Sequence, residues 1–420
     1  NTTSGWKTEF PGLLLIILSV IIFNDETGWP GYSALVPVAG TCLVILASKH
    51  DSIWTCNRFA QAIGRWSYSI YLWHWPLLVG LRYFDAADDI RWTLVAIFAS
   101  ILLGALSYAF IEQTSARAMR RHHGRRAWMQ LGYGTAIPFL AAALVFFGEG
   151  IQKTFRLPEE ALTAAHEKTN MGKLTKCNTK TSRCVIGQGE LLAIVWGDSH
   201  AIATVSAVAE AATKAGGSIL FFGQQSCPVI FNVISTNKFD RYYCKIFNDM
   251  VYSEIERLGK KVPVVIINRA GFYIHPGERQ MYFEDEQATS EPGSSGIYLD
   301  KMTSTLCRIA SIRSVYLVLP IPVMPEDVPE SMSRSLIIKG TSPAISTSLS
   351  SYFHDNSNLI QAITDTKAKC GIHLLDPVEY LCDGEICHGD IDGRPLYSDD
   401  NHLSEFGNRL LVPMFDSIFQ

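Results

Sequence analysis

The sequence predicts α-helical transmembrane segments in residues 1–150, followed by an α/β domain of three layers with a parallel sheet in residues 177–420. Two observations lead to this prediction. Long apolar runs are confined to the first 150 residues, whereas short apolar runs alternate with helical patterns from residue 191 onwards. At 420 residues the chain is also too long for one ordinary domain. The net charge of −4 provides no general basic field for nucleic acid.

The first part contains five apolar segments, at about residues 10–24, 31–48, 66–84, 92–111 and 129–148. The first is short, and the others approach the roughly 20 residues that a helix needs to cross a bilayer. A single segment of this kind could be a buried core helix, but five in succession favour membrane spans. The loops 49–65 and 113–128 are basic and the intervening loops are acidic. Because basic loops stay cytoplasmic, we expect the fifth span to deliver residues 151–420 to the opposite side, which in a bacterium is the periplasm.

The third apolar segment contains His74 in the run Ser67–Leu77. A histidine inside a membrane helix is costly unless it is partnered or lines a polar cavity, so His74 is a candidate functional residue. The alternative is an interfacial histidine among aromatic residues. The chain begins with Asn1, and residues 1–12 lack a charged segment with a small-residue cleavage site. We therefore expect a fragment that lacks its N-terminal part, with residues 151–176 as a periplasmic linker.

The second part predicts strands at 191–196, 218–222, 263–268, 315–319 and 372–375, each short and rich in Val, Ile or Leu. Helical patterns lie between them, at 201–215, 245–258, 297–311 and 357–369, and a terminal helix follows Gly407. Fully apolar strands that alternate with helices predict a parallel sheet covered on both faces. Ligands of such sheets bind at the carboxyl ends of the strands.

Trp196-Gly197-Asp198-Ser199-His200 lies at the end of the first of these strands. A strand that stops at Gly-Asp-Ser and turns into a helix exposes the serine hydroxyl beside a helix N-terminus. Serine needs a base, and the base needs an orienting group. His402 is the candidate base, and Asp399, three residues earlier, is its candidate orienting group. The alternative role for Ser199 is an ordinary helix N-cap. Asp198 and Asp400 are competing carboxylates, and His200 is expected to be a supporting or surface residue.

An oxyanion that forms at Ser199 needs hydrogen-bond donors. The candidates are the backbone N–H of Ser199, Gly223 after the second strand and the side chain of Asn268 at the end of the third. Gly223 could equally be a turn glycine, and Asn268 could cap a turn.

Eight of the ten cysteines follow residue 176, and an even number on the periplasmic side suggests disulfides. The spacing favours the local pairs Cys177–Cys184, Cys227–Cys244 and Cys382–Cys387, which leaves Cys307 and Cys370 to pair across two helices. The connectivity stays open at the level of sequence. Cys42 and Cys56 are expected to be free thiols. A zinc site is the rival interpretation, but no Cys-x-x-Cys pair is present, and we expect no metal.

Gly-Asp-Ser after the first strand, together with Asp-x-x-His near the C-terminus, resembles the SGNH hydrolase superfamily, whose domain is a flavodoxin-like α/β fold. The resemblance implies that Ser199, Gly223, Asn268 and His402 correspond to its four conserved blocks. Ile266-Ile267-Asn268-Arg269 departs from the usual Gly-x-Asn-Asp of the asparagine block. Ser-Tyr-Ser-Ile-Tyr-Leu-Trp-His-Trp-Pro and Ser-Tyr-Ala-Phe-Ile-Glu-Gln, at 67–76 and 107–113, resemble the last two core helices of the acyltransferase-3 family.

The whole chain is similar to bacterial fusions of these two families, and among them to the Salmonella-type O-antigen acetyltransferases. The resemblance implies an inner-membrane enzyme that transfers acetyl, derived from cytoplasmic acetyl-CoA, to a sugar hydroxyl of lipopolysaccharide O-antigen or its lipid-linked precursor. It implies no bound cofactor. The charged residues and histidines of the family's early helices are absent, so the chain as given is not expected to take acetyl from acetyl-CoA alone. Ester hydrolysis, glycan presentation without catalysis, and transport by the membrane part are the alternatives.

Overall fold

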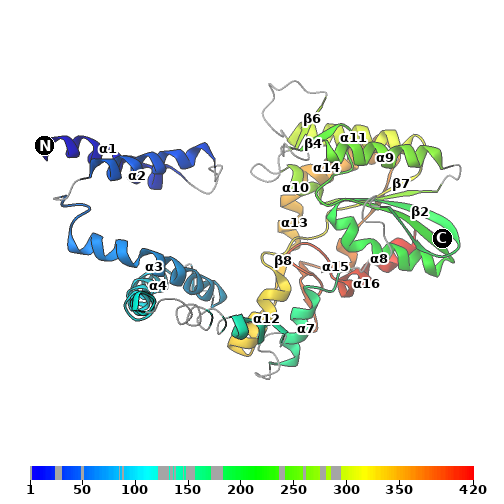
Figure 1. The fold of residues 1–420 in the computed structure, drawn as a ribbon. Helices are drawn as coiled ribbons and strands as arrows, with labels where there is room; N and C mark the ends of the chain where they lie inside the picture. Colours follow the sequence, from blue (N-terminus) through cyan, green and yellow to red (C-terminus); the bar gives the residue numbers. More distant parts are fainter. Residues whose placement is uncertain are drawn as a thin grey trace. The chain divides into compact units, whose positions relative to one another are not determined.

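The computed structural model describes residues 2–23, 31–48, 52–84, 86–87, 89–121, 132, 136, 139–144, 146–147, 157–171, 183–235, 242–258, 262–274, 281–284 and 295–420. The chain divides into two compact units, Asn1–Gly150 and Ile151–Gln420 (Figure 1). This division falls where the composition of the sequence changes from long apolar runs to a mixed pattern.

The first unit is helical in every described segment longer than a few residues. Its elements are α1 (Thr2–Ile22), the 3-10 helix η1 (Tyr32–Ala34), α2 (Leu35–Ala47), α3 (Arg58–Tyr83), α4 (Ile90–Ser107), the π-helical turn η2 (Tyr108–Glu112) and α5 (Gln113–Arg121). Helices α1 and α2 approach closely at two glycines, since a Cβ on Gly12 would lie 2.6 Å from the carbonyl oxygen of Gly40. The Ser69 hydroxyl on α3 donates a hydrogen bond to Glu112 at the end of η2.

Helices occupy the first four of the five predicted apolar segments, and much of the fifth, 129–148, lies outside the described residues. Among the described helices, one, Ile90–Arg117, is long and apolar enough to cross a membrane, while Tyr32–Ala47 is apolar but shorter. Helix α3 is longer, at 26 residues, but it carries Arg58, Arg65 and Arg82. By length and composition, the described residues therefore contain one candidate span where the sequence predicts five.

The second unit is built on a six-stranded sheet in the order β1-β3-β2-β5-β7-β9. Its strands are β1 (Arg183–Gly187), β2 (Glu190–Gly197), β3 (Gly217–Gly223), β5 (Val264–Ile267), β7 (Val315–Val318) and β9 (His373–Leu375). All five predicted strands are present and are parallel to one another. Their order, second-first-third-fourth-fifth along the chain, is flavodoxin-like, so the order reverses between β2 and β5. The antiparallel edge strand β1 is an addition that the sequence pattern did not predict.

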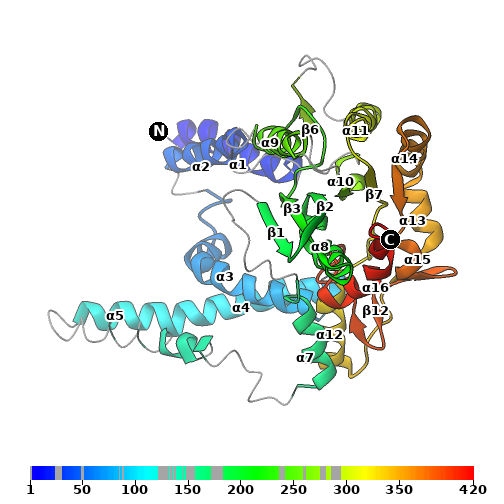
Figure 2. The ribbon, with the colours of Figure 1, turned by 90° about the vertical axis from the view of Figure 1, so that its right-hand side faces the viewer.

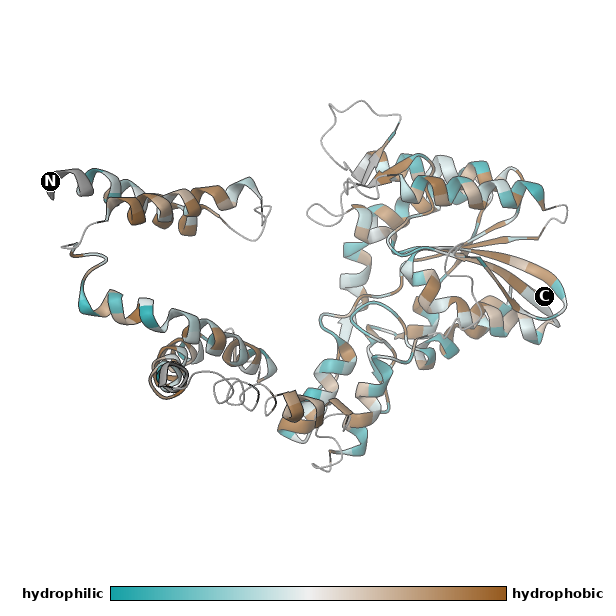
Figure 3. Ribbon diagram, in the orientation of Figure 1, coloured by the Kyte–Doolittle hydropathy of each residue, from teal (hydrophilic) through white to brown (hydrophobic). Residues whose placement is uncertain are grey.

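Helices cover both faces of this sheet (Figures 1 and 2). One face packs against α8 (Ser199–Lys214) and α16 (Glu405–Asp416), and the other against α9 (Tyr243–Arg257), α11 (Ser295–Ala310) and α14 (Ser357–Cys370). Successive side chains of β2 alternate between the two cores: Ala193 and Val195 enter the first, Ile194 and Trp196 the second. Figure 3 shows the strands as mainly hydrophobic along their length. Because their side chains enter a core on each face of the sheet, their sequences lack an alternating polar pattern.

Smaller elements surround the carboxyl edge of the sheet. They are α7 (Glu159–Glu167), α10 (Ala270–Ile274), α12 (Val328–Lys339), α13 (Leu349–Asp355), α15 (Val378–Leu381), and the short strands β4 (Val233–Ser235), β6 (Met281–Phe283), β8 (Ser346–Ser348), β10 (Cys382–Asp383), β11 (Ile386–His388), β12 (Asp390–Ile391) and β13 (Arg394–Pro395). Helix α7 lies within residues 151–176, which the sequence suggested as a linker. Oε1 of its buried Glu167 forms an ion pair with Nη2 of Arg394 at 2.6 Å. This part of the segment therefore packs on the domain.

Candidate active site

Ser199 is the first residue of α8 and lies directly after strand β2. Asp198 is the N-cap of this helix, and its Oδ1 accepts a hydrogen bond from the backbone N–H of His200 at 2.9 Å. Gly197 permits the sharp turn, because a Cβ there would lie 1.9 Å from the carbonyl oxygen of Ile267. The hydroxyl therefore stands at the N-terminus of a 16-residue helix, where developing negative charge is favoured.

The structure brings Ser199, His402 and Asp399 into one continuous hydrogen-bonded chain. Ser199 Oγ donates to His402 Nε2 at 2.8 Å, and His402 Nδ1 donates to Asp399 Oδ2 at 2.7 Å. Both histidine nitrogens are thereby assigned: Nδ1 carries the proton, and Nε2 is free to accept one from the serine. This is the arrangement by which a hydroxyl becomes a nucleophile.

Asp399 is held as an anion by the loop that precedes α16. Its Oδ1 accepts backbone N–H groups from Asn401 at 2.8 Å and His402 at 2.7 Å. Burial raises the pKa of this carboxyl, but the hydrogen bonds from the His402 side chain and from the two backbone groups lower it, and the resulting pKa is about 2. The carboxylate is consequently ionised wherever the protein is folded near neutral pH, and it fixes the tautomer of His402.

The competing carboxylates have other partners. Asp400 Oδ1 accepts from the Asn401 side chain at 2.6 Å. Asp198 is fully buried, and its Oδ2 accepts from the Arg269 backbone N–H at 2.9 Å and from the Tyr273 hydroxyl at 3.1 Å. Burial raises the pKa of Asp198 to about 6 despite these donors. Asp198 thus ties the end of β2 to the loop after β5 and does not touch His402 through a hydrogen bond.

His200 is a buried supporting residue. Its side chain is 2% exposed, its Nε2 donates to Asn401 Oδ1 at 3.1 Å, and its ring centroid lies 4.8 Å from that of His402. Burial, followed by the positive charge of His402, lowers the pKa of His200 to about 3. The ring is therefore neutral and packs against the base without competing for its proton. Of the two positions that the sequence left open for His200, supporting or surface, the structure shows the supporting one.

The two further oxyanion candidates lie at the same edge of the sheet as Ser199. In the strand register, Gly197 pairs with Gly223 on one side and with Ile267 on the other, so Asn268 is one residue beyond this line. Gly223 has no room for a side chain, since a Cβ would lie 2.2 Å from Phe221 Cζ. The Oδ1 atom of Asn268 is buried and has no hydrogen-bond partner within the described chain. Their role toward an oxyanion stays a prediction.

A cavity of about 220 Å³ adjoins the triad through His200. Three elements form its other walls: the loop after β5 with Arg269 and Phe272, the loop after β7 from Pro320 to Val323, and the β8–α13 segment with Tyr352 and Asn356. Sequence reasoning found the triad and missed this cavity. The usable signal was Arg269 itself, a charged residue placed immediately after a buried strand.

The remaining predicted residues lie elsewhere. His74 is on α3 in the first unit, where its Nδ1 donates to the carbonyl oxygen of Tyr71.

Disulfides join Cys227 to Cys244, Cys307 to Cys370 and Cys382 to Cys387. Cys184 is also disulfide-bonded, and its predicted partner, Cys177, lies outside the described residues. Cys42 and Cys56 are in no disulfide. No group of His, Cys, Asp and Glu that could hold a metal ion occurs within the described segments.

Comparisons with known proteins find sequence relatives, a similar solved structure and a matching family model. A predicted O-acetyltransferase of Staphylococcus aureus (strain COL) is 34% identical over 106 residues, which cover 24% of this chain and 18% of that protein. A predicted peptidoglycan O-acetyltransferase of Bacillus subtilis (strain 168) is 26% identical over 129 residues, or 29% and 20% of the two chains. The matched stretches thus span about a fifth of these relatives.

Among solved structures, the periplasmic domain of a lipopolysaccharide acetyltransferase from Salmonella ser. Paratyphi A matches with 17% identity and a TM-score of 0.40, over 55% of this chain and 83% of that domain. The family model described as the SGNH domain fused to AT3 domains matches residues 167–417, which is more than half of the chain. The chain therefore belongs to the family of SGNH domains that are fused to AT3 domains.

Proposed function

We propose that residues 177–420 are a serine-type O-acetyltransferase domain that passes an acetyl group to a sugar hydroxyl. The observation that carries this proposal is the unbroken chain from Ser199 through His402 to Asp399, in a domain whose family is fused to AT3 domains. The names of the S. aureus and B. subtilis relatives point to the same class of reaction.

In the first half of the proposed reaction, Ser199 Oγ attacks the carbonyl carbon of an acetyl donor while His402 Nε2 takes the hydroxyl proton. The tetrahedral intermediate collapses, the bond to the donor breaks, and His402 returns the proton to the departing group. In the second half, a sugar hydroxyl loses its proton to His402 and attacks the acetyl-serine ester. Ser199 leaves as the alkoxide and recovers the proton, so the enzyme is regenerated.

The intermediate carries a negative charge on the former carbonyl oxygen, and donors aimed at that charge supply much of the catalysis in such sites. We assign this role to the backbone N–H of Ser199, with Gly223 and the Asn268 side chain as the further donors. The register of β3, β2 and β5 places all three at one sheet edge, beside the point where the strand order reverses.

We further propose that residues 1–150 are the C-terminal part of an acyltransferase-3 membrane domain with five spans, in a bacterial inner membrane. Acetyl would come ultimately from cytoplasmic acetyl-CoA, reach Ser199 in the periplasm and pass to lipopolysaccharide O-antigen or its lipid-linked precursor. The alternation of basic and acidic loops supports this topology. The disulfides of the second unit fit an oxidising compartment. His74 is a candidate for a polar role within the membrane domain.

Trapping the acyl-enzyme tests the proposal directly. The chain, purified in detergent, is mixed with an aryl acetate, quenched in acid and digested, and the peptide that contains Ser199 is weighed by mass spectrometry. We expect a mass increase of one acetyl group on Ser199, and its loss in Ser199→Ala and in His402→Ala. Ser253→Ala is the control, because Ser253 is an exposed serine of α9 that bonds only within its own helix.

Adding saccharides to the same reaction separates transfer from hydrolysis. Transfer predicts an acetylated saccharide and faster loss of acetyl from Ser199. Acetate as the sole product, with every saccharide tested, would show an esterase instead. An unmodified Ser199, together with full activity in Ser199→Ala, would contradict the proposed nucleophile.

A further inference from the structure

The cavity beside His200 contains a positive charge that no carboxylate neutralises. Arg269 forms no ion pair within the described chain, whereas Arg257 and Arg394 each pair with a glutamate. The Arg269 guanidinium lies 5.1 Å over the ring of Phe272 and lines the cavity. Stacking on an aromatic ring holds the planar guanidinium while leaving its N–H groups available as a two-pronged donor.

Arg269 is fixed close to the reacting groups. Its own backbone N–H donates to Asp198, the N-cap of the helix that begins at Ser199. Its charge also contributes, after burial and the charge of His402, to the lowered pKa of His200. The guanidinium is therefore an electrostatic neighbour of His200, whose ring packs against that of His402.

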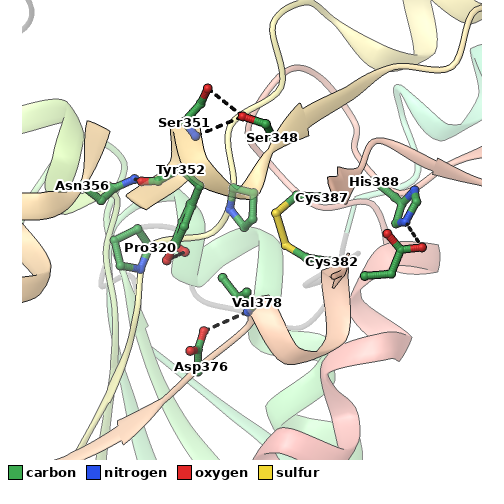
Figure 4. The surroundings of a disulfide bond; sticks show 12 residues. Pro320, Ser348, Ser351, Tyr352, Asn356, Asp376, Val378, Cys382, Cys387 and His388 are labelled. Carbon is green, nitrogen blue, oxygen red and sulfur yellow. Dashed lines mark hydrogen bonds and ion pairs between the residues drawn. A yellow bond between two sulfur atoms is a disulfide. The ribbon is translucent and has the colours of Figure 1, made fainter. Parts of the chain in front are cut away.

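The opposite wall presents oxygen atoms. Asn356 Nδ2 donates to the carbonyl oxygen of Tyr352 at 2.9 Å, which fixes the amide and leaves its Oδ1 without a partner in the described chain. Asp355 is exposed and lines the same wall, so its charge is screened by solvent. The Tyr352 hydroxyl donates to Pro320 at 2.9 Å and thereby braces α13 against the loop after β7 (Figure 4). Fixed oxygen acceptors of this kind suit sugar hydroxyls.

The cavity volume of about 220 Å³ is of the order of one sugar residue. Two requirements of a sugar site are then met in one place: a ring-sized space, and hydroxyl acceptors at Asp355 and Asn356 at the end of α13. The guanidinium adds a third feature, selection for negative charge.

We propose that this cavity binds a sugar residue that bears an anionic group, a carboxylate or a phosphate, and that Arg269 recognises that group. This inference rests on the proposed function for its place in the reaction, since the sugar would supply the accepting hydroxyl. The anion would bind the two N–H groups of the guanidinium side by side, and the sugar ring would direct hydroxyls toward Asn356 and Asp355.

The test is a binding measurement that needs no turnover. The chain carrying Ser199→Ala, in detergent, is titrated with galacturonate, galactose 6-phosphate and galactose, and dissociation constants are obtained from saturation-transfer NMR. We expect at least one anionic sugar to bind about tenfold more tightly than galactose, as a charge-assisted bidentate contact provides. The comparison of galacturonate with galactose 6-phosphate separates a carboxylate ligand from a phosphate ligand.

In Ser199→Ala/Arg269→Gln the preference for the anionic sugar should disappear, while Arg269→Lys should keep part of it because charge remains without the fork. Arg257→Gln, an exposed arginine of α9, is the matched control and should change nothing. Raising the salt concentration should weaken the preference in the parent protein, which tests the idea without any variant. Equal affinity for galactose and both anionic sugars, or an unchanged preference in Arg269→Gln, overturns the inference. Because serine acetylation is measured separately, failure of the proposed function and failure of the pocket assignment are distinguishable.

Discussion

His200, which follows Gly-Asp-Ser in the sequence, makes the stability of the domain depend on pH in acid. In the folded protein its pKa is about 3, chiefly because it is buried, against 6.5 for an exposed histidine. Below pH 6.5 the His200 imidazole is therefore protonated in the unfolded chain but stays neutral in the folded chain. The stability that His200 contributes is fully present above pH 6.5 and is lost as the pH falls toward 3.

We predict that His200→Gln makes the melting temperature less sensitive to acid. Glutamine retains a donor for Asn401 but cannot be protonated. The quantity to compare is the melting temperature of the variant minus that of the parent. This difference should be larger at pH 4.5 than at pH 7.5 by about 3 °C or more. Asp198, whose raised pKa of about 6 acts in the opposite direction as the pH rises, is present in both proteins and cancels. Parallel melting curves across this range would contradict the prediction.

Substitution of Asn268 is expected to change the rate of catalysis without changing the stability of the domain. Its buried Oδ1 has no hydrogen-bond partner in the described chain, so removal of the amide sacrifices no bond made by that atom. If the side chain donates to the oxyanion, Asn268→Ala should lower the rate of Ser199 acetylation by about 100- to 1000-fold. The melting temperature should change little. Acetylation kinetics and thermal unfolding of the same preparation check both parts, and a normal rate would remove Asn268 from the oxyanion site.

At the scale of elements, the parallel strands and the triad were predictable for the same reason. Each central strand is a short, fully apolar run because both of its faces are buried, and the Asp-x-x-His spacing is local. The pattern failed for β1, an edge strand of Arg183-Cys184-Val185-Ile186-Gly187 whose residues are only partly buried. It also missed α12, although Asp327 caps that helix and accepts from Glu330 N–H at 2.9 Å, a spacing that sequence rules can recognise.

The cavity could not be predicted because its walls come from three loops that meet only through the register of the sheet. Its outer wall depends on a small sheet in the order β10-β11-β8, whose strands have two or three residues and no hydrophobic period. In that sheet Cys382 faces Cys387, and their disulfide lies beside α13 (Figure 4). Strand β8 runs directly into α13, and Leu349 N–H donates to Glu385 in the hairpin turn at 2.8 Å.

We predict that Cys382→Ser/Cys387→Ser weakens acceptor binding while leaving serine acetylation intact. Removal of this disulfide, which closes a short loop, lowers the free energy of unfolding by roughly 2 kcal/mol in the chain-entropy model. This is enough to loosen the hairpin that contacts α13. The expected signature is a raised KM for the saccharide with an unchanged rate of Ser199 acetylation, because no triad residue belongs to the hairpin. Cys227→Ser/Cys244→Ser is the control, since that disulfide lies in the core on the other face of the sheet. An unchanged KM would show that the hairpin does not contribute to binding of the acceptor.

At the scale of the whole molecule, the proposed acetyl route requires that the two parts of the chain meet different compartments. The predicted basic loop 49–65 includes Arg58 and Arg65, which lie in the first turns of α3, whereas residues 151–420 carry the disulfides. In the proposed topology, positive charge holds this loop in the cytoplasm, and the disulfides lie on the oxidising side. Cys56, in the same loop and outside any disulfide, is then a native probe of the cytoplasmic face. In a Cys42→Ser background, which removes the other free cysteine, Lys214→Cys adds a second thiol at the exposed end of α8.

We predict that a membrane-impermeant maleimide labels the thiol introduced by Lys214→Cys in intact spheroplasts, and labels Cys56 only after lysis. Mass spectrometry of the labelled peptides assigns each site, and Cys56→Ser in the same background removes the second signal. The order of labelling decides between topologies, because an odd number of spans must separate the two thiols if they face opposite sides. Labelling of both thiols before lysis, or of neither, would place them on one side of the membrane. In that case Ser199 would share a compartment with the loop before α3, and acetyl would not have to cross a bilayer to reach it.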